Sequence, residues 1–246
     1  MRRYLRILTV LFALPMAAQT TPHRSTTAAP KKPGTTAATH PTAIIDTTAG
    51  KLTCTLFPDK APIGAANFIG LAKGTKNWVH PKTGRQMHGV ALYSGTIFHR
   101  VIPEFMIQGG DPLGDGTGGP VGPGFPFKNE TSPDLTFDRP GRLAYANAGP
   151  DTNASQFFVT EVPFPRLDGN YTIFGQCDEA SVEVVKKIAR MRRNQNPGPT
   201  QDRPYDPPKI NKITILGSGS TVHHATRPKT GASPAPKQPP QQNKQQ

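Results

Sequence analysis

The acidic residues of this chain occupy only one part of it, and this limits what can fold. All 16 Asp and Glu lie within residues 43–216, whereas residues 1–42 and 217–246 have none and are rich in Thr, Ala, Pro and Gln. Low-complexity chain of this kind cannot bury enough apolar surface to form a core. The remaining segment is long enough for one core that buries roughly 70% of its unfolded surface. We therefore expect one domain at 43–216 between two disordered tails.

The positive charge is concentrated in the flanking segments. The formal net charge is +13 and the pI is near 10, yet residues 43–216 carry only +3 of it. A basic balance often indicates nucleic-acid binding. Here the excess is spread along the tails without interleaved aromatic residues. The sequence thus predicts no specific nucleic-acid partner, and association of the tails with a polyanion remains an alternative.

The N-terminus is typical of an export signal. Residues 1–18 begin with three arginines and end in the apolar run Ile7–Ala18, the pattern of a secretory signal peptide. The run is too short to span a bilayer, which needs about 20 residues. We expect a signal peptide at 1–18, a Thr/Ala/Pro-rich linker at 19–42, and a periplasmic or secreted protein without a stable membrane span. The Arg2-Arg3 pair leaves a twin-arginine route as the alternative to general secretion.

The chain has two cysteines, Cys54 and Cys177. In an exported protein they could form a disulfide. The interpretation we favour is that both are small buried apolar residues in strands. Two cysteines so far apart, with singly scattered histidines, match no zinc-ligand spacing, so we expect no metal.

Short apolar runs between turn residues predict a mostly-β fold. Two segments have apolar residues at helical spacing: one begins at Pro62 and stops at Gly74, and the other covers Ser181–Arg193. We expect a loop at Thr75–Gly95 and one strand-like segment at Thr96–Gln108. The other expected strands are Ala43–Thr48, Lys51–Phe57, Gly141–Ala146, Gln156–Thr160, Thr172–Gln176 and Ile210–Leu216. Many short strands with two helices favour a barrel or a sandwich.

The common catalytic motifs are missing from the sequence. It contains no nucleophile elbow, no phosphate-binding GxxxxGK and no HExxH. Four polar residues without acidic character, Arg100, Gln108, Asn147 and Gln156, are instead set among apolar strand residues. A few hydrogen-bonding groups in apolar surroundings are the usual composition of a ligand pocket. These residues predict a peptide or small-molecule site.

The segment Phe98–Asp111, which reads FHRVIPEFMIQGGD, closely resembles the central signature of the cyclophilin family of peptidyl-prolyl isomerases. Further matches stand in family order at Ala65–Phe68, Gly116–Gly119, Ala146–Pro150, Ser155–Phe158, Leu167–Gly169 and Phe174–Gly175. The resemblance therefore covers the whole of residues 43–216. It implies an eight-stranded antiparallel β-barrel capped by two α-helices.

The resemblance also implies an activity, which is faster rotation about X–Pro bonds without any cofactor. The expected partners are proline-containing unfolded or flexible polypeptides, whose folding after export a monomer would assist. Carried over by position, Arg100 is the catalytic residue. The substrate-binding residues are Phe105, Met106, Phe158 and Leu167 around the proline ring, Gln108, Ala146, Asn147 and Gln156 along the peptide backbone, Gly116 and Ala148 at the groove wall, and Tyr171.

The sequence departs from the family pattern at two groove positions. Arg166 replaces the tryptophan that often precedes Leu-Asp-Gly, and Tyr171 stands where histidine is common. The first change predicts weak binding of cyclosporin-type inhibitors, and neither change affects Arg100. The alternative to an enzyme is a proline-peptide binding module without turnover, against which the retained arginine argues.

Overall fold

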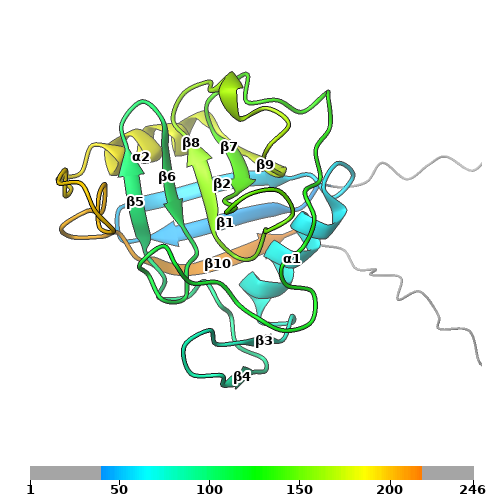
Figure 1. Ribbon diagram of the computed structural model, residues 1–246. Coiled ribbons are helices and arrows are strands. Elements are labelled where there is room, and N and C mark those ends of the chain that lie inside the picture. The colour runs from blue at the N-terminus through cyan, green and yellow to red at the C-terminus, as the bar shows by residue number, and fades with distance from the viewer. Residues whose placement is uncertain (1–39, 218–246) are drawn as a thin grey trace, which may run out of the picture. The chain divides into compact units, whose positions relative to one another are not determined.

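The computed structural model describes residues 40–217, so the expected signal peptide at 1–18, nearly all of the linker and the basic tail lie outside the described residues. An eight-stranded antiparallel sheet in the order β10-β1-β2-β9-β7-β8-β6-β5 curls into a barrel (Figure 1). This confirms the expected fold. The strands are β1 (Thr42–Thr47), β2 (Gly50–Leu56), β5 (Phe98–Ile102), β6 (Met106–Gly109), β7 (Arg142–Tyr145), β8 (Phe157–Thr160), β9 (Ile173–Cys177) and β10 (Ile210–Leu216).

The two edge strands of the sheet, β5 and β10, meet just outside their ends. Ile97 and Lys209 form an isolated antiparallel bridge. The Phe98 N–H donates to the Pro208 carbonyl at 3.0 Å, and the Ile210 N–H donates to the Thr96 carbonyl at 2.8 Å. These bonds satisfy backbone groups that an open edge would leave free for another chain.

The expectation of one strand-like segment at Thr96–Gln108 is wrong, because a tight turn divides it into β5 and β6. Pro103 has no N–H for a ladder, and Glu104 takes a left-handed conformation with φ of 58°. The chain therefore reverses within three residues, and Arg100 becomes the register partner of Gln108.

The segment Thr75–Gly95, expected to be a loop, contains a small two-stranded hairpin of β3 (Trp78–Val79) and β4 (Gln86–Met87). Trp78 is buried, and its indole N–H donates to the Val90 carbonyl at 3.1 Å. The hairpin lies outside the eight-stranded sheet.

Two α-helices cover opposite ends of the barrel (Figure 1). Helix α1 (Pro62–Lys73) begins at proline and ends at Gly74, whose φ of 72° permits the left-handed C-cap. Helix α2 (Glu179–Ala189) is capped by the Asp178 side chain, which accepts a hydrogen bond from the Ser181 N–H.

Helix α2 ends earlier than the expected Ser181–Arg193. After Ala189 the chain turns back, and Arg193 bridges Pro204. The Val101 N–H then donates to the Asp202 carbonyl at 2.9 Å, so this segment covers the free edge of β5. Where a further helical turn would stand, the Tyr205 N–H donates to the Arg192 carbonyl at 3.0 Å and the Asn194 N–H to the Arg203 carbonyl at 2.8 Å.

Two apolar clusters pack against the sheet, one on each of its faces. Phe157 is fully buried in the larger cluster inside the barrel, whereas Phe158 belongs to a smaller one with Met106 and Leu167. Neighbouring strand residues point to opposite faces of the sheet, which places these two phenylalanines in different clusters. The smaller cluster forms the apolar base of the site described below.

Cys54 and Cys177 form a disulfide between β2 and β9, where they are register partners. The interpretation of two unlinked buried residues is therefore wrong, although both do lie buried in strands. The pairing depends on the register of strands 123 residues apart in sequence. Within residues 40–217, neither helix has the length and apolar character needed to cross a membrane.

Candidate functional site

Arg100 lies on β5 directly opposite Gln108 on β6. Its guanidinium donates a hydrogen bond to the Gln108 side-chain oxygen at 3.3 Å, which is its single side-chain hydrogen bond to the described residues. Arginine has five N–H donors in a planar group, so most of them remain available. Among residues 40–217 no carboxylate lies within ion-pair distance of Arg100.

An apolar pocket of about 110 Å³ opens beside Arg100. Phe158 is its central aromatic residue, stacked on Phe137 and meeting Tyr171 edge to face at 5.5 Å. Phe105 packs against Phe164 at the pocket's edge, with ring centroids 4.4 Å apart. All nine lining residues were predicted: Arg100, Phe105, Met106, Gln108, Ala146, Asn147, Phe158, Leu167 and Tyr171.

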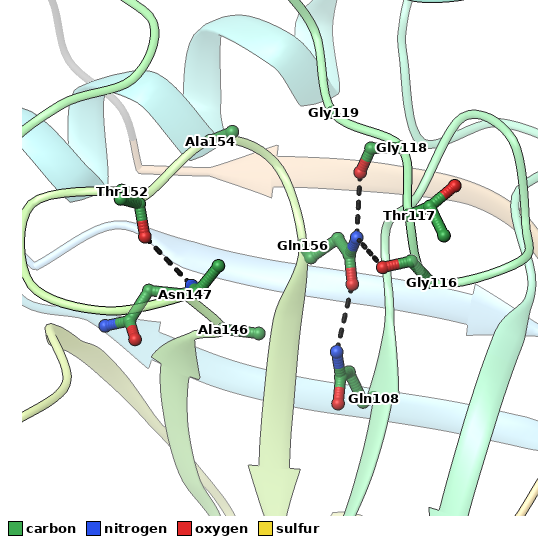
Figure 2. A pocket seen from close by; sticks show the side chains of 11 residues that line it. Gln108, Gly116, Thr117, Gly118, Gly119, Ala146, Asn147, Thr152, Ala154 and Gln156 are labelled. Carbon is green, nitrogen blue, oxygen red and sulfur yellow. Dashed lines mark hydrogen bonds between the residues drawn. The ribbon is translucent and has the colours of Figure 1, made fainter. Parts of the chain in front are cut away.

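A second pocket of about 280 Å³, drawn in Figure 2, shares Gln108, Ala146 and Asn147 with the first. The other three predicted residues, Gly116, Ala148 and Gln156, line this second pocket. The structure thus brings all the predicted site residues onto one groove with two adjoining hollows. Among the described residues, 40–217, no carboxylate or lysine lines either hollow.

A chain of side-chain hydrogen bonds runs from Arg100 through Gln108 to Gln156 across the floor of the groove, and Figure 2 shows the part from Gln108 onward. The Gln108 amide N–H donates to the Gln156 side-chain oxygen at 2.9 Å. The Gln156 amide in turn donates to the carbonyls of Gly116 and Gly118 at 3.0 and 2.8 Å. Because each amide is held at both ends, the orientation of Gln108 beside Arg100 is set before any ligand arrives.

Asn147 has its side chain engaged within its own loop. Its amide N–H donates to the Asn170 carbonyl at 3.0 Å, and its side-chain oxygen accepts from the Gly149 N–H at 3.3 Å. The side chain therefore holds the loop, and the main chain of Asn147 is the part that remains for a ligand.

Sequence reasoning missed Asp111 as a residue that shapes the groove. Its buried carboxylate accepts backbone N–H bonds from four residues of the glycine-rich loop: Leu113, Asp115, Gly116 and Gly118. A Cβ on Gly118 would lie 2.1 Å from the Asp111 carboxylate, so the loop can close around it only with glycine there. The signal in the sequence was an acid placed directly before a glycine-rich stretch.

His99 lies beneath this loop and is buried. A Cβ on Gly116 would come within 3.3 Å of its ring. Burial lowers the pKa of His99, with Arg203 and Arg100 adding to the effect and Asp111 and Asp115 opposing it. His99 therefore stays neutral near pH 7 and supports the loop without adding charge to the groove.

The arrangement can bind a small apolar ring in the first pocket and direct N–H donors at a polar atom beside it. Its side chains offer no nucleophile paired with a base. Among residues 40–217 there is no group of three His, Cys, Asp or Glu side chains placed to hold a metal ion.

The family whose sequence model matches residues 42–215 is described as "Cyclophilin type peptidyl-prolyl cis-trans isomerase/CLD". Peptidyl-prolyl cis-trans isomerase B of Streptomyces anulatus is 47% identical over 174 residues, which cover 70% of this chain and 95% of that protein. Peptidyl-prolyl cis-trans isomerase A of Mycobacterium tuberculosis is 46% identical over 175 residues, covering 71% of this chain and 91% of the relative.

Solved structures give the same result. The crystal structure of a Cryptosporidium parvum cyclophilin-type peptidyl-prolyl cis-trans isomerase matches with a TM-score of 0.59 and 32% identity, over 72% of this chain and 96% of that one. A second structure of that protein, in the presence of the dipeptide Ala-Pro, matches with a TM-score of 0.58 over 71% of this chain and 98% of that one.

Proposed function

The chain belongs to the cyclophilin-type peptidyl-prolyl cis-trans isomerases, and we propose that its groove turns X–Pro bonds in exported proteins with Arg100 as the catalytic residue. The observation that carries this assignment is the pocket with an apolar base of Met106, Phe158 and Leu167 beside a guanidinium that has no counter-ion among the described residues. The pocket suits a pyrrolidine ring, and the related protein in the presence of Ala-Pro supports the same class of ligand.

Rotation about an X–Pro bond requires the loss of amide resonance. The barrier is about 18–20 kcal/mol, and the unaided reaction takes tens to hundreds of seconds. No bond is made or broken, so the enzyme has only to bind the twisted state better than either planar isomer. A thousandfold acceleration requires about 4 kcal/mol of such preference.

Most of the groove residues hold the substrate on either side of the X–Pro bond. The proline ring enters the pocket formed by Phe105, Met106, Phe158 and Leu167, which fixes one side of the bond. Gln108, Gln156 and the main chain at Ala146 and Asn147 hold the flanking peptide, with Gly116 and Ala148 at the adjoining wall. Tyr171 supports Phe158 from the side.

Arg100 acts on the bond that turns. As the nitrogen becomes pyramidal its lone pair accepts a hydrogen bond that a planar amide cannot accept. A guanidinium can donate to this nitrogen and to the proline carbonyl together, and a charged donor forms the stronger bond. The contact to Gln108 keeps the guanidinium at the pocket's edge, so orientation costs little during turnover.

The proposed substrates are extended segments of exported proteins, and the proposed enzyme is a monomer in the periplasm or outside the cell. Support comes from the N-terminal sequence pattern and from an open groove in which Arg100 is the one charged residue among those that line the two hollows in the described part of the chain. A groove of this kind accepts many sequences around a proline, as a folding assistant requires.

A protease-coupled isomerisation assay on an Ala-Pro tetrapeptide tests the role of Arg100. Arg100→Ala and Arg100→Lys should both lower kcat/KM by about ten- to a thousandfold, because lysine keeps the charge but not the planar set of donors. Arg85→Lys makes the same chemical change at an exposed hairpin residue and is the matched control.

Peptide affinity, measured by titration, should change much less in the Arg100 variants, since the pocket remains. Near-normal turnover in Arg100→Lys would show that positive charge alone suffices. Peptide binding without any turnover in the unaltered protein would favour the binding-module alternative.

A further inference from the structure

Glu161 is a buried carboxylate directly after β8, with only 2% of its surface exposed. Lysine and glutamate are among the residues least often buried unless paired. One carboxylate oxygen accepts from the Glu104 backbone N–H at 2.9 Å, and the other forms an ion pair with Arg190 after the last turn of α2. A charge so placed needs an explanation beyond solubility.

The turn that Glu161 contacts is the strained link between β5 and β6. Glu104 has φ of 58°, in the left-handed region that favours glycine. The turn therefore carries a backbone cost that other contacts must offset. The hydrogen bond from the Glu104 N–H to an ionised carboxylate is a strong contact of the required kind.

Glu161 also contacts the next residue of the turn, Phe105, through its backbone. The Glu161 N–H donates to the Phe105 carbonyl at 2.8 Å. Phe105 lines the apolar pocket and packs on Phe164. The main chain of Glu161 thus holds the Phe105 carbonyl, and the side chain of Glu161 holds the N–H of the residue before it, Glu104.

We propose that Glu161 is a positioning residue that fixes the Phe105 wall of the proline pocket, with Arg190 as its counter-ion. This inference rests on the proposed role of the pocket in binding the proline ring. Arg190 balances the charge from the exposed side, since an unpaired buried carboxylate would be strongly destabilising. The end of α2 and the edge of the groove are thereby joined through one side chain.

A split between KM and kcat separates positioning from plain stability. The pocket holds the ring in the planar and twisted states alike, so a displaced Phe105 weakens both and raises KM with little change in kcat. A purely structural role would instead reduce the fraction of active enzyme, which lowers apparent kcat and leaves KM unchanged.

The experiment compares three single variants of the full chain in the isomerisation assay. Glu161→Met has a similar volume but no acceptor, and it should raise KM about five- to tenfold. Glu161→Gln keeps an acceptor for the Glu104 N–H and should stay within about twofold of the unaltered KM. Glu183→Met makes the same substitution on α2, where it removes an exposed ion pair with Lys186, and is the matched control.

A second background tests whether Glu161 acts through the turn. Glu104→Gly removes the conformational cost, so the turn no longer depends on the carboxylate. Adding Glu161→Met to Glu104→Gly should then raise KM less than twofold, which is the coupling expected of residues acting through one contact. If Glu161→Met raises KM as much in the Glu104→Gly background as it does alone, the proposal is wrong. It is also wrong if Glu161→Met alone leaves KM unchanged and lowers only the apparent kcat.

Hydrogen exchange on the unaltered protein decides the question if Glu161→Met does not fold. The Glu104 N–H belongs to an exposed residue, and the proposal requires that its exchange be slowed by the bond to Glu161. Exchange at the rate of a free amide would refute it. Failure of the unaltered protein to turn over any X–Pro peptide would count against the proposed function itself. Normal turnover together with a contrary result in the KM comparison or in hydrogen exchange would count only against the positioning role of Glu161.

Discussion

Removal of the Cys54–Cys177 disulfide is expected to lower the free energy of unfolding by about 3–5 kcal/mol. The bond joins residues 123 positions apart, and its main effect is to restrict the unfolded chain. The loop-entropy relation gives about 5 kcal/mol at 25 °C for a closed loop of this length. The free energy of unfolding of a typical domain is only about 5–15 kcal/mol, so this one bond contributes a large share of it.

Equilibrium urea unfolding measures the free energy of unfolding in three samples: oxidised protein, protein with reductant, and the double variant Cys54→Ala/Cys177→Ala. The last two should unfold at lower urea, and thermal unfolding should show their Tm lower by roughly 6–20 °C. The oxidised protein should also show the smaller m value, because a cross-linked unfolded chain exposes less surface. Reductant should have no effect on the double variant, which controls for reductant acting elsewhere.

The same samples should keep their isomerase activity under native conditions, since neither cysteine lines the two pockets of the groove. A difference below about 1 kcal/mol between oxidised and reduced protein would refute the loop-entropy reasoning. Two reactive thiols in the purified, denatured protein before any reductant is added would show that the bond is not formed.

Three further outcomes are expected. Arg166→Trp should tighten inhibition by a cyclosporin-type ligand while peptide turnover changes by less than about twofold, because an indole offers a flat apolar face and an N–H donor; nanomolar inhibition of the unaltered protein would contradict this. A fragment of residues 40–217 should retain the turnover of the full chain, since the described domain contains the whole groove, and a large loss with normal circular dichroism would show that the flanking segments contribute. Burial lowers the pKa of Lys76 from 10.5 to about 8, so on raising the pH the folded protein releases this proton before the unfolded chain does. The free energy of unfolding should therefore rise between pH 8 and 10.5 relative to that of Lys76→Met. Parallel pH profiles of the two proteins in urea unfolding would contradict this prediction.

The groove could be predicted from the sequence because its residues lie in short segments with strong local patterns. The period-two alternation of strands placed Phe157 in the core and Phe158 in the pocket. Arg100 and Gln108 were identified as polar residues set in apolar strands, although the turn between them was not. Their facing register follows from that turn.

The missed features depend on contacts between distant parts of the chain. The disulfide requires the register of β2 against β9, which no local pattern reports. Glu161 resembles any acid at the end of a strand until Arg190 and the Glu104 N–H are placed beside it. The early end of α2 likewise goes with bonds to residues further along the chain, since Arg192 and Asn194 bond to Tyr205 and Arg203.

The pairing of β1 with β10 has a mechanical consequence. Thr42 at the start of β1 and Leu216 at the end of β10 are register partners, so tension applied through both flanking segments pulls on the same end of this strand pair. The pair would then peel apart one hydrogen bond after another instead of resisting as a whole. Peeling extends only the residues outside the Cys54–Cys177 bond, and the part of the chain between the two cysteines, which includes Arg100 and the whole groove, bears no load.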